Sequence, residues 1–448
     1  MGRKNAPENE PPRKKGRKGV VPFAFLGHQF DAIDEQTSKR HILYLVLCCV
    51  AAKIAVALVT VAGFHSFVDL FDINVYFQHA LMPLQGQFPF ASDFQYPVLI
   101  FIPMMIALLP AIIFQSFEAF AFAFQLLMVI CDIVTIVCIY LIGLRIWDER
   151  RAFYAGLMYA AAFSAAYFVI TKYDAFPTSL LMLAILFTLY RQEMKGYALS
   201  VLGFFTKVFP GLALPFFVLY NAKKSSFKDQ VIAAAKVVVP ISLVLFLPLF
   251  ILHPETLRIY LPVRSELGYY SNTLTFTIYS WLHDIFRIGL TIDAVSAVMY
   301  LAMGAGILAL LYAAYVLPGQ DPKLLLKLIL CSVVLVVVCS KVRSPQYIVW
   351  FTPLLCLLAI DDMKKILALF AFQALAYLEF PLMFGAFYTA LKYTDPALSP
   401  GWMLTLIVFT LEYLALFVCV WWMVDLPELA RRILKAIPRS PHRGTAAS

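Results

Sequence analysis

The sequence predicts an all-α, multi-pass membrane protein, a bundle of about ten transmembrane helices with two further re-entrant or broken segments. Of the 448 residues, 62% are hydrophobic and 14% are charged, whereas a soluble domain carries about 25% charged residues. The mean hydropathy is +0.81. Because so few charged side chains cannot cover a water-facing surface, we expect lipid to surround most of the chain.

Most of the chain divides into apolar segments that approach or exceed the roughly 20 helical residues needed to cross a bilayer core. These predicted spans are 42–64, 119–144, 152–171, 176–191, 231–252, 292–317, 324–340, 346–360, 366–384 and 402–424. Their linkers are short, so we expect one transmembrane domain over 42–424. A basic disordered tail, 1–41, precedes it, and a basic tail, 425–448, follows it.

The apolar segment 98–115 is not counted as a span, although it contains few polar residues. It holds Pro103 and Pro110, and a full crossing would place Arg145 and Arg150 on the side that selects against basic residues. We therefore predict a re-entrant or interfacial segment.

The apolar segment 196–220 contains Lys207 and Pro210 near its middle. A lysine at mid-membrane costs roughly 2.5–3.5 kcal/mol, and a proline removes a helical hydrogen bond. Two half-helices that meet at 206–210 are expected, since irregular backbone at this depth is tolerated only inside protein or beside a water-filled cavity.

These assignments place both tails in the cytoplasm and put 65–118, which contains no Lys or Arg, outside. The net charge of +9 comes largely from the tails. Basic tails beside membrane helices contact anionic lipid, so no nucleic-acid partner is expected. All eight cysteines lie in apolar runs, which argues against a disulfide framework or a zinc site.

Five polar residues in the first external stretch follow each other at spacings of 4, 3, 4 and 3 residues. They are His65, Asp69, Asp72, Tyr76 and His79. This spacing predicts an interfacial helix with one acidic face. Two acids without a basic partner on that face would suit a general base; the alternative is an ordinary amphipathic helix with a solvated face.

Several basic residues fall on or near the external side, where positive charge is disfavoured. They are Lys172, Lys207, Arg258, Arg264, Arg287, Lys341 and Arg343. A phosphate or diphosphate group at the outer leaflet would explain them. The alternative is salt bridging to Asp174, Glu255, Glu266 and Asp284.

A polar stretch at 340–351 combines two of these cations with Ser344, Gln346 and Tyr347 at the start of a predicted span. Such a patch can bind a ligand at the interface, whereas an aromatic anchor at the membrane surface would explain only Trp350. A carboxylate and a phosphate site together suggest sugar transfer from a lipid phosphate, with inversion by analogy to inverting glycosidases.

The sequence also resembles a known family in four successive motifs. The first lies in the external stretch and combines D-x-x-V-Y at 72–76, G-x-x-P-F at 86–90 and F-x-Y-P at 94–97. The other three are the segments 131–152, 203–215 and 340–355. This order resembles GT-C glycosyltransferases, in particular glycosyltransferase family 87 and the catalytic subunit of the first GPI mannosyltransferase.

The resemblance implies a GT-C-like fold and a hexosyltransferase that uses polyprenyl- or dolichyl-phosphate-mannose, with Asp72 as base and Asp69 as the alternative. It implies no cofactor and makes a divalent metal unnecessary. The donor phosphate is expected at Lys207, Lys341, Arg343, Arg264 and Lys172. The other substrate-binding candidates are Tyr76, His79, Tyr96, Asp174, Gln346 and Tyr347.

Two rival functions stay open at this point, a transporter or lipid-linked sugar flippase and a non-catalytic scaffold. Transporters also use broken helices and membrane charges, but here the polar residues gather on one side and no internal repeat is visible. The expected acceptor is a glycolipid or glycan, and a small membrane subunit is an additional candidate partner. The compact loops favour a prokaryotic cell membrane over the endoplasmic reticulum.

Overall fold

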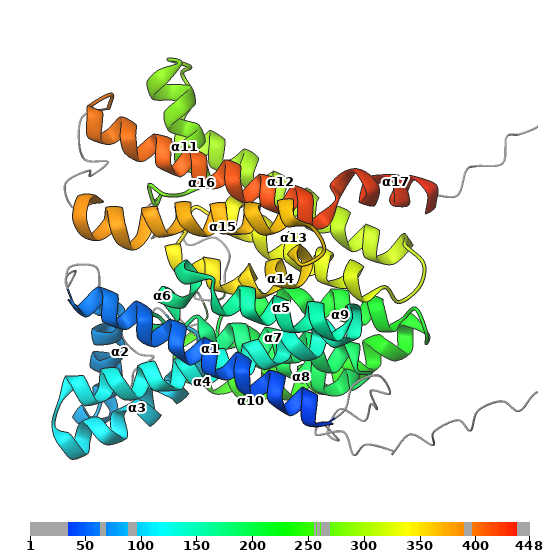
Figure 1. Ribbon diagram of the computed structural model, residues 1–448, viewed down its shortest axis with the longest axis horizontal. Coiled ribbons are helices and arrows are strands. Elements are labelled where there is room, and N and C mark those ends of the chain that lie inside the picture. The colour runs from blue at the N-terminus through cyan, green and yellow to red at the C-terminus, as the bar shows by residue number, and fades with distance from the viewer. Residues whose placement is uncertain are drawn as a thin grey trace, which may run out of the picture.

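The computed structural model describes residues 35–62, 69–87, 96–254, 257, 260, 269–388 and 397–436. Within these ranges every regular element is helical and no β-strand occurs, which confirms the predicted all-α class. The helices form a bundle in which most of the long axes run along the same direction (Figure 1).

The described residues form seventeen α-helices, several of them joined by 3₁₀ or π segments. The α-helices are α1 (Glu35–Ala62), α2 (Phe71–Leu81), α3 (Phe101–Phe114), α4 (Phe117–Ile146), α5 (Glu149–Ala160), α6 (Phe163–Thr171), α7 (Ala175–Leu189), α8 (Glu193–Phe204), α9 (Leu214–Asn221), α10 (Phe227–Leu252), α11 (Leu274–Tyr279), α12 (Ile292–Val316), α13 (Pro322–Cys339), α14 (Ile348–Ala359), α15 (Met363–Tyr377), α16 (Pro400–Val424) and α17 (Leu426–Ala436). The shorter segments are η3 (Met82–Gln85), η5 (Val98–Ile100), η6 (Phe209–Ala213), η8 (Ser280–Ile285), η9 (Pro345–Tyr347) and η10 (Leu378–Tyr388).

Within the described ranges, seven helices are long and apolar enough to cross a membrane, and α5 with α6 forms an eighth if this pair, bent by 59°, is one span. The protein is therefore a multi-pass membrane protein. The predicted spans 176–191 and 346–360 are α7 and α14, which are shorter, with 15 and 12 residues. At about 1.5 Å per residue neither alone covers a 30 Å core, so the count of ten full spans stays a prediction.

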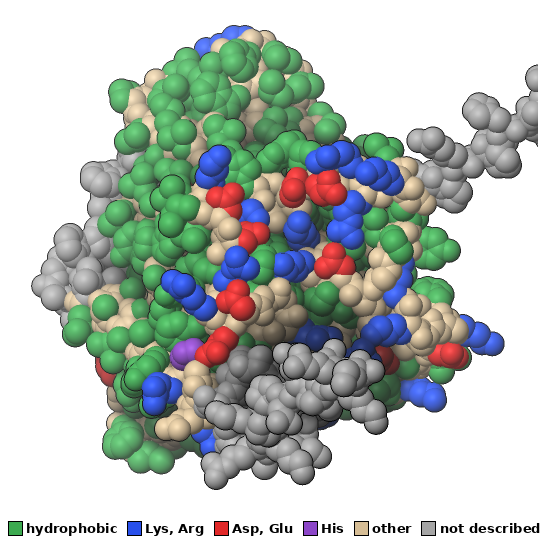
Figure 2. All heavy atoms as spheres, turned by 45° about the vertical axis from the view of Figure 1, so that its right-hand side comes forward, with side chains coloured by type: hydrophobic (Ala, Val, Ile, Leu, Met, Phe, Trp, Pro, Cys, Tyr) green, Lys and Arg blue, Asp and Glu red, His purple; other side chains and the backbone are tan. Residues whose placement is uncertain are grey.

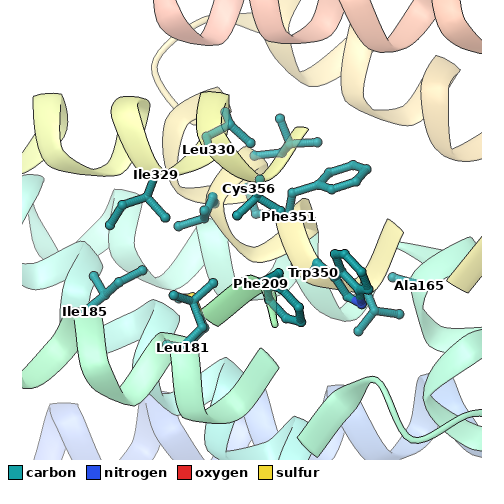
Figure 3. Close-up of a cluster of buried hydrophobic side chains, with 14 of the residues drawn as sticks. Ala165, Leu181, Ile185, Phe209, Ile329, Leu330, Trp350, Phe351 and Cys356 are labelled. Atoms are coloured by element: carbon teal, nitrogen blue, oxygen red, sulfur yellow. The ribbon is translucent and has the colours of Figure 1, made fainter. Parts of the chain in front are cut away.

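The two short helices lie in the centre of the bundle. Every residue of α14 is buried, and α7 packs beside it. Figure 3 shows their side chains meeting those of η6 and α13 in one apolar cluster, with Phe209 against Trp350. In α10 and α12, in contrast, only 6% and 17% of the residues in an apolar stretch of 18 residues are buried. The outer helices therefore face lipid, while α7 and α14 are surrounded by other helices.

The segment predicted to contain two half-helices does contain them. Helix α8 ends at Phe204, and the chain turns before η6 and α9 lead back. An ideal Cβ on Gly203 would lie 2.5 Å from Cβ of Pro210, so the two arms approach each other closely. The helix break thus places Lys207 at the tip of a hairpin.

Helix α3, within the segment predicted to be re-entrant or interfacial, has 14 residues and includes Pro110. Together with η5 it is still shorter than the transmembrane helices. Helix α3 packs on α2 and α4 at the left of Figure 1. Its length agrees with the predicted partial crossing.

The bundle has two chemically different ends. The start of α1 and helix α17 lie at the right in Figure 1, and α2 lies at the left; we name these the terminal end and the α2 end. Most loops at the terminal end carry Lys or Arg, and Figure 2 shows many such side chains on the face that comes forward. Those at the ends of helices there include Arg145, Arg150, Arg151, Arg191, Lys195, Lys223, Lys224, Lys323, Lys364 and Lys365.

Three features differ from the sequence prediction. Helix α1 begins at Glu35, inside the tail predicted to be disordered. Helix α17 occupies part of the C-terminal tail, where Arg432 contacts Asp321 at 3.3 Å. A third feature was missed: within the bundle, Lys53 Nζ lies 2.5 Å from Asp132 Oδ2, and both side chains are buried. These two charges stand inside predicted spans because each neutralises the other.

Candidate functional site

The acidic face predicted over 65–79 is only partly present. Helix α2 starts at Phe71, whose backbone N–H donates to Oδ1 of Asp69 at 3.0 Å, so Asp69 lies just before the helix. His65 lies outside the described residues. Asp72, Tyr76 and His79 do lie within the helix, at spacings that keep them on one face.

Asp69 and Asp72 share one basic partner, Lys172. The Lys172 ammonium forms an ion pair with Oδ2 of Asp69 and lies 3.1 Å from Oδ2 of Asp72. The expectation that these acids lack a basic partner is therefore wrong: the turn after α6 brings Lys172 to them from a distant part of the sequence. Lys172 is 5% exposed, so its charge is buried against the two carboxylates.

A cavity of about 590 Å³ opens beside this group. Its walls come from the start of α2, the turn after α6, the turn before α11, the segment before α14 and the start of η10. The lining residues are Asp69, Phe71, Asp72, Lys172, Tyr269, Tyr270, Ser271, Asn272, Arg343, Ser344, Pro345, Gln346, Glu379 and Phe380. This size suits one or two sugar rings or a phosphate headgroup.

Arg343 lines this cavity but does not offer a free positive charge. Its Nη2 donates to Oε2 of Glu379 at 3.1 Å and also to Glu412, and its Nη1 donates to the carbonyl of Asn272 at 3.1 Å. No acid lies near Arg343 in the sequence, but η10 and α16 bring Glu379 and Glu412 to it.

Lys207 is also paired. Its ammonium lies 2.5 Å from Oδ1 of Asp174 and 4.5 to 4.9 Å from the centres of three aromatic rings. These rings belong to Tyr173, Tyr347 and Trp350. The indole N–H of Trp350 donates to the same Asp174 oxygen at 2.5 Å. Lys207 therefore fixes the tip of the α8–α9 hairpin inside the bundle and does not line the cavity.

Three tyrosines lie between the Asp69 and Asp72 carboxylates and Asp174. The rings of Tyr76, Tyr96 and Tyr173 lie 5.3 to 5.8 Å apart in edge-to-face contacts. The hydroxyl of Tyr76 is buried and has no hydrogen-bond partner among the described residues. Burial raises the pKa of Tyr96, and burial lowers the pKa of His79, whose ring faces Tyr96 at 6.1 Å.

The segment 340–347 carries the remaining predicted residues. Gln346 lines the cavity, while Tyr347 stacks on Trp350 with ring centres 3.9 Å apart. Lys341 lies beside the rim: its carbonyl accepts the N–H of Tyr270 at 3.1 Å, and its ammonium is 5.8 Å from the ring of Tyr269. Of the side chains the structure describes, no carboxylate pairs with Lys341. Arg264 lies outside the described residues.

No group of three or more His, Cys, Asp or Glu side chains that could hold a metal ion occurs among the described residues. Every described cysteine is a free thiol. That catalysis needs no divalent metal stays a prediction.

Sequence reasoning missed Glu379, Glu412 and Asn272. The two glutamates had a visible signal, because each is the lone acid within a predicted span, and an intramembrane acid calls for a partner. Asn272 had no such signal, since its neighbours in sequence are ordinary loop residues.

Comparisons with known proteins match a family and a solved structure. The model of glycosyltransferase family 87 matches residues 94–340, which is more than half of the chain. A crystal structure of ArnT from Cupriavidus metallidurans in the apo state is similar over 87% of this chain and 77% of that one, with 14% identity and a TM-score of 0.45. No curated protein sequence matches.

Proposed function

The chain belongs to glycosyltransferase family 87, and we propose that it transfers a hexose, with mannose as the expected sugar, from polyprenyl or dolichyl phosphate to a glycolipid or glycan. The observation that carries this proposal is the cavity at the α2 end, where Asp72 stands beside Lys172 and a wall of polar side chains. Such a site offers a base and hydrogen-bond partners for sugar hydroxyls.

We assign the general base to Asp72 rather than to Asp69. Both oxygens of Asp69 are occupied, one by the N–H of Phe71 and one by Lys172. Asp72 contacts Lys172 through Oδ2 only, and no described residue bonds its Oδ1. A general base must reach the proton that it removes, so the less constrained carboxylate suits the role.

In the proposed reaction, Asp72 takes the proton of an acceptor hydroxyl. The acceptor oxygen forms a bond to the anomeric carbon of the donor sugar, and the bond from that carbon to the phosphate oxygen breaks. The polyprenyl phosphate leaves with the bonding electrons. Attack from the face away from the phosphate inverts the anomeric centre, by analogy with inverting glycosidases.

Lys341 is the cation that supports the phosphate site best. It lies near the cavity rim beside Tyr269, without a carboxylate partner among the described residues. Lys172, Lys207 and Arg343 already pair with acids. We therefore expect them to support phosphate binding indirectly, by holding the surrounding side chains in place. Arg264 keeps its proposed role in binding phosphate.

The charge distribution supports the proposed orientation. Basic residues crowd the terminal end, and the positive-inside rule assigns such an end to the cytoplasm. Both termini are then cytoplasmic, and the cavity opens outside, in a prokaryotic cell membrane or in the lumen of the endoplasmic reticulum. A small membrane subunit remains part of the proposal as a partner.

The test is transfer by purified protein in lipid, with polyprenyl-phosphate-mannose and a glycolipid extract as acceptor. Because general-base catalysis contributes about 10²- to 10⁴-fold, we expect Asp72→Asn to lose at least about 100-fold in rate. Asp69→Asn should lose less, because the base remains. The matched control is Asp361→Asn, which removes only a surface ion pair to Lys365.

Full activity of Asp72→Asn in correctly folded protein would remove Asp72 as base. Movement of the intact lipid-linked sugar across the membrane, with no new glycoside formed, would instead support a flippase.

A further inference from the structure

Arg343 lies between two buried glutamates, at the wall of the cavity. Its Nη2 donates to Oε2 of Glu379 at 3.1 Å and to Oε1 of Glu412. The side chains of Arg343, Glu379 and Glu412 are 7%, 2% and 1% exposed. Because both acids bond the same nitrogen, their carboxyl groups are direct neighbours.

Among the described residues, no second basic side chain forms an ion pair with either glutamate. Asn272 Nδ2 donates to Oε1 of Glu379 at 2.8 Å, and the Tyr413 hydroxyl donates to the carbonyl of Asn272 at 2.7 Å. The closest other cation on the cavity wall, Lys172, lies over the ring of Phe380 and pairs with Asp69 and Asp72. Oε2 of Glu412 is buried and has no hydrogen-bond partner among the described residues.

Two ionised glutamates and one arginine would leave an uncompensated negative charge inside the protein, which is costly. We propose that Glu379 and Glu412 share one proton, so that their cluster with Arg343 is neutral. Both carboxyl groups bond Nη2 of Arg343, so the O–H of one is placed to donate to an oxygen of the other. Adjacent carboxyl groups in other proteins share a proton for the same reason.

The shared proton gives the cluster a positioning role. Arg343 belongs to the segment that leads to Gln346, Glu379 lies in η10 directly after α15, and Glu412 lies in α16. Arg343 and Glu379 both line the cavity that holds Asp72. A neutral cluster can hold these three elements together without adding charge to the cavity wall. This inference does not depend on the reaction proposed above.

The test uses infrared spectroscopy of the full chain in lipid, where the carbonyl band of a protonated carboxyl group is resolved from ionised carboxylates. We expect the unmodified protein to show this band in neutral buffer. Glu412→Gln and Glu379→Gln should each abolish the band and leave the melting temperature nearly unchanged, since each variant still pairs one carboxylate with Arg343. Glu428→Gln, on the exposed surface of α17, is the control and should keep the band.

The double variant Glu379→Gln/Glu412→Gln provides the second measurement. It leaves Arg343 buried without a counter-charge, so a large drop in melting temperature is expected. Two results would overturn the proposal: a parent spectrum without the band, or a rise in melting temperature on Glu412→Gln, as expected if both glutamates were ionised.

Discussion

Lys207 and Asp174 form a buried ion pair of 2.5 Å, although 33 residues separate them in the sequence. Lys207 stands at the tip of a hairpin between α8 and α9, and Asp174 stands at the start of α7. The pair therefore joins the broken segment to the centre of the bundle, next to the tyrosines that lead to Asp72.

Removing one partner of this pair should destabilise the protein strongly. Lys207→Met leaves the Asp174 carboxylate buried without its cation, at a cost of about 3–5 kcal/mol. Thermal unfolding in detergent measures the loss. The control is the double variant Lys207→Met/Asp174→Asn, which removes both charges and should recover much of the stability. If the losses of Lys207→Met and of Asp174→Asn, each measured alone, simply added up in the double variant, the two residues would not be coupled.

Lys341 should affect the donor more than the acceptor. A hydrogen bond to a charged group is worth about 1.5–3 kcal/mol, so Lys341→Ala should raise the apparent KM for the lipid-phosphate donor about tenfold or more. The measurement is steady-state transfer with each substrate varied in turn. Lys365→Ala, at the other end of the bundle, is the control. Equal increases in both KM values would contradict a role at the donor phosphate.

Close packing of the hairpin predicts that Gly203→Ala is destabilising. The added Cβ would meet Cβ of Pro210 at 2.5 Å, and overpacking of this kind costs about 1–3 kcal/mol. Gly304→Ala in α12 is the matched control, because nothing lies within 4 Å of its added methyl group. There the substitution should be neutral or stabilise the helix by about 0.5–1 kcal/mol. A stable Gly203→Ala protein would show that the two arms can separate.

Membrane orientation can be tested by cysteine labelling, because all eight native cysteines lie in helices. Leu290→Cys places a thiol at the α2 end of α12, and Ser225→Cys places one before α10 at the terminal end. An impermeant reagent should label the first in intact cells and the second only after permeabilisation. The reverse pattern would invert the proposed topology.

The sequence by itself determined the helical class, the membrane environment, the family and the break at Lys207. Each of these follows from local information: the length of apolar runs, the position of a proline, or short motifs in order. Matching 94–340 to family 87 confirms the resemblance that those motifs indicated. The same local information found Asp72 and Gln346, which both line the cavity.

Only the tertiary structure decided which of the predicted cations have an acidic partner among the described residues. In the sequence, Lys172 has Asp174 two residues away, whereas Lys207, Arg343 and Lys341 lack an acidic neighbour. The fold pairs Lys172 with Asp69 and Asp72 instead, brings Asp174 to Lys207, and brings Glu379 and Glu412 to Arg343. It brings none of the described acids to Lys341. The Coulomb energy depends on distance in space and on burial, and neither can be read from spacing along the chain when the partners lie on different helices.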